Sequence, residues 1–209
     1  MPSAGLNTNI DAGGVSINKA VQISGDGAIG YEISLPVAYV GQLTTRTDDE
    51  TGTLTMSGGH GITTGAIIDI YWATGARYGV LVGTVSVNSV PIGADNAGTG
   101  DVLPTNLTAI TAAVQVPANV AIDGDNLKVL VLCLDTSEAA GKGQVDFLSD
   151  APASIEQFDL TANRPRAFDI EGGATNPFAG DPIVSLVASN GSAVMAATLK
   201  IAGLQDVTP

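Results

Sequence analysis

The fold is decided by the stretch Gly58-Gly59-His60-Gly61-Ile62-Thr63-Thr64-Gly65-Ala66-Ile67-Ile68-Asp69-Ile70-Tyr71-Trp72, followed by Gly79-Val80-Leu81-Val82-Gly83-Thr84-Val85-Ser86-Val87. Its pattern is a glycine-rich turn, a strand, a short hairpin and a second strand. Gly79 and Gly83 have the spacing of β-bulges or barrel corners. This order of elements predicts a small antiparallel barrel-like module, which we place at about residues 53–116.

The composition of the whole chain also favours strands. The 209 residues are dominated by small and β-branched types, and Val, Ile and Thr suit a pleated surface. The 26 glycines and 10 prolines supply the many turns that an all-β chain needs. We therefore predict an all-β fold with little helix, in which the barrel-like module is joined by an antiparallel β-sandwich of the jelly-roll type.

Two hairpins are predicted outside the module. Apolar residues alternate with polar or small ones in residues 15–23 and 29–35, which favours two strands joined by a turn. Near the C-terminus, residues 183–188 and 194–201 are strand-like and flank Asn190-Gly191, a dipeptide typical of tight hairpin turns.

The length allows one large or two small domains. Pro117 is the predicted boundary between an N-terminal β-domain, residues 1–117, and a C-terminal β-sandwich, residues 118–209. In the second, residues 127–134 are almost continuously apolar, so we expect a central strand covered on both faces. One alternative stays open: the barrel could be inserted between strands of one larger sandwich, because residues 15–43 also need partners.

The charge balance limits the possible partners. Eight basic and 21 acidic residues give a net charge of −13, and only 14% of residues are charged. Nucleic-acid backbones require clustered Lys and Arg, so we expect no nucleic-acid binding. A surface with few charges permits dense packing against other chains, although an ordinary acidic soluble protein has the same balance.

The N-terminus and the single cysteine exclude further classes. Residues 1–5 have neither the basic nor the apolar region of a signal peptide, and no run is long enough for a membrane helix, so we expect no membrane segment. Cys133 lies in an apolar run and is expected to be a small buried residue. A lone cysteine rules out an internal disulfide framework and a cysteine-rich zinc site.

No residue pattern predicts catalysis. His60 is the only histidine, and its place between two glycines indicates a turn or surface residue. Nucleophile-elbow and phosphate-loop motifs are absent from the sequence, so we expect no enzyme and no cofactor. Residues 95–101 and 123–126 carry Asp and Asn in turns; calcium binding there stays open, although neither has EF-hand spacing. Trp72 ends a buried-looking strand and is expected in the core rather than as a sugar-stacking platform.

The candidate partner-binding residues are Arg164, Arg166 and Phe178, which stand out in a chain poor in charge and aromatics. Arg and aromatic residues dominate the energetics of many interfaces. Pro177 and Pro182 stiffen the loop that carries Phe178. The alternative, held equal, is that Phe178 fills the core of its own domain.

Several segments resemble small β-barrel modules of tailed-bacteriophage virion proteins. These segments are His60-Gly61-Ile62-Thr63-Thr64-Gly65, Ile68-Asp69-Ile70-Tyr71-Trp72, residues 80–90 and Thr99-Gly100-Asp101-Val102-Leu103-Pro104. Such modules often have Asp where this chain has Ala66. The resemblance covers about a quarter of the chain and implies a structural role in the virion, with no catalytic residues to transfer.

The predicted function is a non-enzymatic structural component of a phage particle, located in the virion as a capsid decoration (cement) protein or a tail-associated protein. It is expected to act by self-association and by binding other virion proteins of the capsid or tail. A homo-oligomer is expected because closed cyclic symmetry is common, with a trimer as the preferred form. The alternative is a carbohydrate-binding or adhesive β-module.

Overall fold

The computed structural model describes residues 8–12, 15–19, 26–122, 127–135, 142–148, 154–161, 166–169, 178–180, 184–194 and 196–206. Within these ranges the protein is all-β, with antiparallel sheets and no helix, which confirms the predicted fold class. No helix in the described part is long and apolar enough to cross a membrane.

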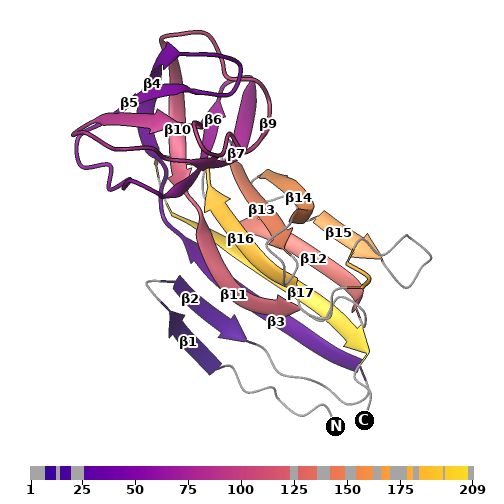
Figure 1. The fold of residues 1–209 in the computed structure, drawn as a ribbon. Coiled ribbons are helices and arrows are strands. Elements are labelled where there is room, and N and C mark those ends of the chain that lie inside the picture. Colours follow the sequence, from indigo (N-terminus) through magenta and orange to yellow (C-terminus); the bar gives the residue numbers. More distant parts are fainter. Residues whose placement is uncertain are drawn as a thin grey trace. The chain divides into compact units, whose positions relative to one another are not determined.

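The chain divides into two compact units. Unit 1 contains Met1–Leu35, Val116–Ala188 and Ala196–Pro209, and unit 2 contains Pro36–Gln115 and Ser189–Met195. The chain therefore passes between the units four times, and unit 2 is an insertion into unit 1. Figure 1 shows the colours of unit 1 running from indigo in β3 to yellow in β17, so both ends of the chain contribute to it.

Unit 1 is a β-sandwich. Its six-stranded sheet has the order β1 (Thr8–Ala12), β2 (Val15–Lys19), β3 (Asp26–Leu35), β17 (Ala197–Asp206), β12 (Leu127–Asp135) and β15 (Arg166–Asp169). Its four-stranded sheet has the order β11 (Val116–Ile122), β16 (Val184–Asn190), β13 (Lys142–Leu148) and β14 (Ser154–Thr161).

The core of unit 1 lies between these two sheets. One sheet contributes Ile33, Leu130 and Leu199, and the other contributes Phe147 and Leu186; all five side chains are buried in one cluster. Alternation is visible in β3, β12 and β17, where Ile33 and Leu35, Leu130 and Leu132, and Leu199 and Ile201 all enter this core.

Unit 2 is one seven-stranded sheet that curls towards closure. Its order is β8 (Ser89–Ile92), β5 (Gly52–Met56), β4 (Tyr39–Arg46), β10 (Thr108–Val114), β6 (Ile67–Trp72), β7 (Gly75–Leu81) and β9 (Thr99–Gly100). The first strand meets the segment after β7, where Val82 is bridged to Ile92 and the Gly83 N–H donates to the Pro91 carbonyl at 2.9 Å. The curled sheet encloses its own core, which includes Leu43, Ile68, Val80 and Ile110.

A β-bulge lies at Gly79, one of the two glycines predicted to mark bulges or corners. The β6–β7 register shifts between the pairs Ile68–Val80 and Ile70–Arg77, and Gly79 has a φ of 68°. Glycine reaches this left-handed conformation without the steric cost of a Cβ. Gly83 lies at the closure of the sheet, so both glycines stand where the curvature of the sheet requires them.

The contiguous division into residues 1–117 and 118–209 differs from this arrangement. The predicted boundary falls beside Gln115/Val116, where the chain does change units. However, β3 pairs with β17 along ten residue pairs, from Leu35–Ala197 to Asp26–Asp206, which ties the first 35 residues to the C-terminal part. The alternative left open from the sequence, a barrel inserted between the strands of a larger sandwich, matches the two units.

The C-terminal hairpin prediction is wrong. β16 and β17 belong to different sheets, because β16 pairs with β11 and β17 pairs with both β3 and β12. Asn190 does make a turn, since its Oδ1 accepts the Ser192 N–H at 3.0 Å, but this turn lies in unit 2. A turn signal fixes local backbone conformation, whereas strand pairing depends on partners elsewhere in the chain.

The apolar run at 127–134 forms most of β12, which lies between β17 and β15. Leu130 and Leu132 are fully buried, while Val131 on the opposite face is only partly buried. The strand is therefore interior to its sheet, but its second face is more open than predicted.

We expect Leu132→Ala to lower the free energy of unfolding by about 2–5 kcal/mol, because it removes buried methyl groups and leaves a cavity. The measurement is the urea midpoint, with Val131→Ala as the control on the more open face of the same strand. Equal midpoints for the two variants would contradict the burial of Leu132.

Candidate functional site

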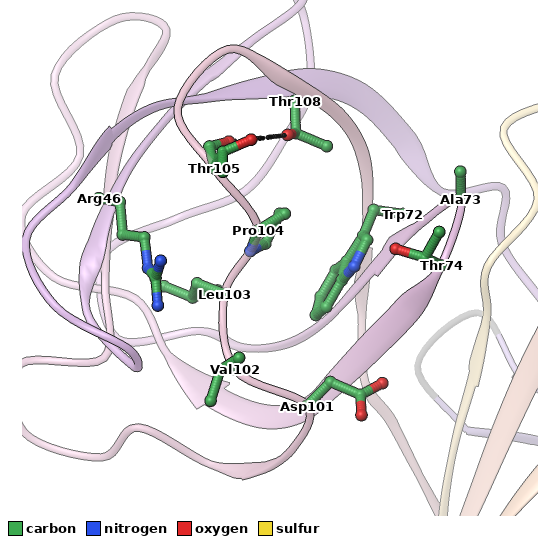
Figure 2. A pocket seen from close by; sticks show the side chains of 10 residues that line it. All are labelled: Arg46, Trp72, Ala73, Thr74, Asp101, Val102, Leu103, Pro104, Thr105 and Thr108. Atoms are coloured by element: carbon green, nitrogen blue, oxygen red, sulfur yellow. Dashed lines mark hydrogen bonds between the residues drawn. The ribbon is translucent and has the colours of Figure 1, made fainter.

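A pocket of about 580 Å³ lies in unit 2, beside the segment that leads from β9 to β10. Figure 2 shows Arg46 and Trp72 on opposite sides of Leu103 and Pro104. The ten lining residues are Arg46, Trp72, Ala73, Thr74, Asp101, Val102, Leu103, Pro104, Thr105 and Thr108.

Three polar side chains of this pocket, those of Arg46, Asp101 and Thr108, have intramolecular partners. The Arg46 Nε donates to the Asp48 carbonyl at 3.0 Å, and its Nη2 is paired with Asp49. Asp101 Oδ2 accepts the Ala76 N–H at 3.1 Å, and the Thr108 hydroxyl donates to the Thr105 carbonyl at 2.7 Å. The pocket therefore has the features of an indentation between structural loops, with no acid–base pair poised for proton transfer.

Trp72 is part of the core of unit 2, as predicted. Its exposed fraction is 7%, and it packs in the same cluster as Leu103 and Ile70. A sugar-stacking residue presents a ring face to solvent, whereas Trp72 is almost wholly buried.

The loop before β5 is acidic and well ordered by its own hydrogen bonds. Asp48 Oδ1 accepts the backbone N–H groups of Glu50 at 2.8 Å and Thr51 at 2.7 Å, and its Oδ2 accepts the Thr51 hydroxyl at 2.8 Å. The Glu50 N–H, followed by the Thr51 groups, lowers the pKa of Asp48 because these donors stabilise the charged form. Asp48 therefore keeps its negative charge at neutral pH, while Asp49 and Glu50 are paired with Arg46 and Arg77.

His60 is a structural residue, and the prediction of a turn or surface histidine is wrong about its exposure. The residue is in a turn but only 5% exposed. Its Nδ1 accepts the Ile62 N–H at 3.0 Å, and its Nε2 lies 3.0 Å from the Val87 carbonyl oxygen. Since that oxygen can only accept, the ring proton is on Nε2, and both ring nitrogens are used to hold two loops together.

A buried carboxylate, not singled out from the sequence, organises the middle of unit 2. Asp69 is fully buried, and its Oδ1 accepts the Gly79 N–H at 2.8 Å and the Gln115 amide at 2.7 Å. Its Oδ2 accepts the Ser189 hydroxyl, which is also 2.8 Å from the Tyr71 hydroxyl. The bulge releases the Gly79 N–H from the strand ladder, and Asp69 satisfies it.

A buried arginine, also missed, holds the segment around β9. The Arg77 side chain is 3% exposed, with its Nε donating to the Ala97 carbonyl at 2.5 Å and its Nη1 to the Asp101 carbonyl at 3.0 Å. Its Nη2 forms an ion pair with Glu50 at 2.9 Å. A signal was present in the sequence, because Asp69 and Arg77 are the two charged residues of an otherwise apolar strand pair.

The structure describes two of the three candidate partner-binding residues, Phe178 and Arg166. Phe178 is 1% exposed and packs against Phe147, with ring centroids 4.9 Å apart, so it fills the core of unit 1 as in the alternative left open. Burial leaves no side-chain area for the anchoring role. Arg166 begins β15, which forms an edge of the six-stranded sheet. Arg164 lies outside the described residues.

The candidate calcium loops have different outcomes. In residues 95–101, Asn96 Oδ1 accepts the Gly98 N–H at 3.0 Å and Asp101 holds the Ala76 N–H, so these oxygens serve turns. Residues 123–126 lie outside the described ranges. Among the residues that are described, no group of three or more His, Cys, Asp or Glu side chains is placed to hold a metal ion.

Comparison with known proteins gives two solved structures. No protein-family model and no curated protein matches this chain. The first structure is of the Gx strain of infectious bursal disease virus, with a TM-score of 0.20, 11% identity and coverage of 98% of this chain and 74% of that chain. The second, of T=1 particles derived from infectious bursal virus, has a TM-score of 0.21, 13% identity and coverage of 98% and 68%. Both are virus particles, and at these TM-scores the likeness carries no argument about this chain.

We expect His60→Ala to lower the free energy of unfolding by about 1–3 kcal/mol, because it leaves the Ile62 N–H and the Val87 carbonyl without their partner. Thermal or urea unfolding measures this effect. Thr63→Ala, at an exposed position three residues away, is the control, and we expect it to change stability by less than about 0.5 kcal/mol. Equal stability of the two variants would show that His60 is dispensable.

We expect Asp69→Asn to cost about 1–3 kcal/mol, because the new amide group faces donors and leaves at least one of them unpaired. Chemical denaturation monitored by Trp72 fluorescence reports on unit 2. The matched control is Asp95→Asn, which makes the same chemical change at an exposed position. If the two variants unfold at the same denaturant concentration, the buried network does not stabilise the unit.

Proposed function

We propose that the protein is a non-enzymatic structural component of a phage particle, a capsid decoration (cement) protein or a tail-associated protein, that acts by self-association and by binding other virion proteins. The observation that carries this proposal is that three side chains of unit 2 with the chemistry for catalysis serve to hold its backbone instead. His60, Asp69 and Arg77 are all buried, and all of them bind backbone groups of their own unit.

The surface of the described residues supports an association role. Charged residues are scarce, and four large apolar side chains are exposed by more than half of their area, Val87, Val102, Leu107 and Val194, with Val40 at 49%. Exposed aliphatic side chains are unfavourable in a free monomer, and removing them from water under another chain stabilises the complex.

Edge strands offer a second route to association. β15 forms one edge of the six-stranded sheet and β14 one edge of the four-stranded sheet. An edge strand has unpaired backbone donors and acceptors that can bind another chain. Arg166 lies on the first of these edges, and we propose that it and Arg164 pair with carboxylates of a neighbouring chain across such a contact.

The alternative function, a carbohydrate-binding module, rests on the pocket in Figure 2, which has threonine hydroxyls and one tryptophan. Two observations weaken this alternative. Trp72 is buried, and the charged side chains of Asp101 and Arg46 are already bound to groups of the protein. Titration with oligosaccharides tests it directly, since a sugar ligand would quench the fluorescence of the single Trp72.

We expect the full chain to form a closed oligomer or to sediment with purified heads or tails of the phage. Light scattering after size-exclusion chromatography and electron microscopy measure the first outcome, and co-sedimentation measures the second. Arg166→Glu should weaken the association without lowering the thermal midpoint of the chain. A chain that is monomeric throughout and binds neither heads nor tails would contradict the proposed function.

A further inference from the structure

Two residues of unit 2 combine backbone strain with an exposed apolar side chain. Within the described ranges, the non-glycine residues with positive φ are Val87, at 51°, and Leu107, at 68°. Their exposed fractions are 86% and 66%. The left-handed region is costly for branched side chains, and such strain persists only where surrounding structure imposes it.

Val87 is at the tip of the hairpin that precedes β8. Ser86 and Ser89 exchange two backbone hydrogen bonds, of 3.0 and 2.8 Å, so Val87 and Asn88 are the two residues of a tight turn. The first position of such a turn, when φ is positive, strongly favours glycine. The chain has instead a β-branched apolar residue there, whose side chain is almost wholly in solvent.

The strained turn is held from inside the unit. The buried His60 ring donates to the Val87 carbonyl oxygen, and the Asn88 carbonyl accepts the Met56 N–H at 2.9 Å. Tyr39 packs edge-on against the His60 ring, with centroids 6.4 Å apart. These contacts fix the direction of the tip before any partner arrives, which lowers the entropy cost of docking.

The surroundings of Val87 carry no charge. Residues 36–45, 51–68 and 78–94 contain no Asp, Glu, Lys or Arg. Strand β5 runs from the acidic loop towards Val87. Gly52, at its start, follows the acidic loop Asp48-Asp49-Glu50, and Thr55, near its end, pairs with Ser89 of the Val87 hairpin. The charge-free end of β5 and the acidic end are therefore about 10 Å apart along the strand.

We propose that the charge-free end of unit 2 is a contact surface between two copies of this chain, with Val87 as its apolar anchor. This inference rests on the proposed function and names the surface through which the chain associates with itself. A chain with a net charge of −13 repels its own copies, so a contact between copies is favoured where both surfaces lack carboxylates. Val40, which is 49% exposed, belongs to the same end of unit 2. Its carbonyl accepts the N–H and the hydroxyl of Ser57, three residues before His60, and its side chain adds apolar area.

The test measures the self-association of the full chain by sedimentation velocity over a range of concentrations. We expect Val87→Asn and Val87→Gly to weaken association by about tenfold or more, because each removes the buried anchor. Both replacements accept positive φ more readily than Val, so the thermal midpoint of the dissociated chain should stay equal or rise.

Leu107→Asn is the matched control, since it makes the same kind of change at the other strained tip. Leu107 follows Asn106, whose Oδ1 accepts the Arg46 N–H, and the Arg46 side chain is paired with Asp49 of the acidic loop. Association that is lost in the Val87 variants and kept in Leu107→Asn supports the proposal. Val87 variants that associate like the unchanged chain overturn it and leave the proposed function standing. An unchanged chain that stays monomeric at all concentrations overturns both the proposal and the self-association part of the proposed function.

Discussion

The pairing of β3 with β17 is the interaction on which the rest of the structure depends. It joins residues 26–35 to residues 197–206, so the two ends of the chain become neighbours in one sheet. Once these strands are paired, the residues between them must form both the second sheet of the sandwich and the whole of unit 2. The sandwich core and the insertion are therefore consequences of one long-range strand pair, and such pairs carry a large loop-closure cost that their packing must repay.

Local sequence patterns predicted the class of this fold well, and strand partners poorly. The spacing of Gly79 and Gly83 and the glycine-rich turn before the strand at residues 67–72 identified a curled sheet, because bulges and turns are local properties of the backbone. The C-terminal segment shows the opposite case. Asn190-Gly191 signals a turn correctly, yet the flanking strands go to different sheets, because no residue near the turn records which distant strand offers a better partner.

The candidate site could be predicted only in part. His60 was recognised as a turn residue, but its ring bonds to the carbonyl of Val87, 27 positions away, and no short stretch of sequence reveals that partner or the burial of the ring. The sequence left two interpretations of Phe178 open. Its contact with the Phe147 ring, with centroids 4.9 Å apart, places it in the core of unit 1. Asp69 is the clearest omission: a carboxylate inside an apolar strand is improbable unless donors converge on it, and its donors come from three separate segments of the chain.

The Ser189 hydroxyl that binds Asp69 has a meaning for biosynthesis. Residues 36–115 are continuous and leave the ribosome long before residue 189, so most of the curled sheet can form while the chain is still being made. Its buried carboxylate receives the Ser189 hydroxyl only after residues 116–188 have been made, and β17 follows shortly after Ser189 in the chain. A chain that stops before residue 189 therefore lacks one donor to Asp69 in unit 2 and the strand β17 in unit 1.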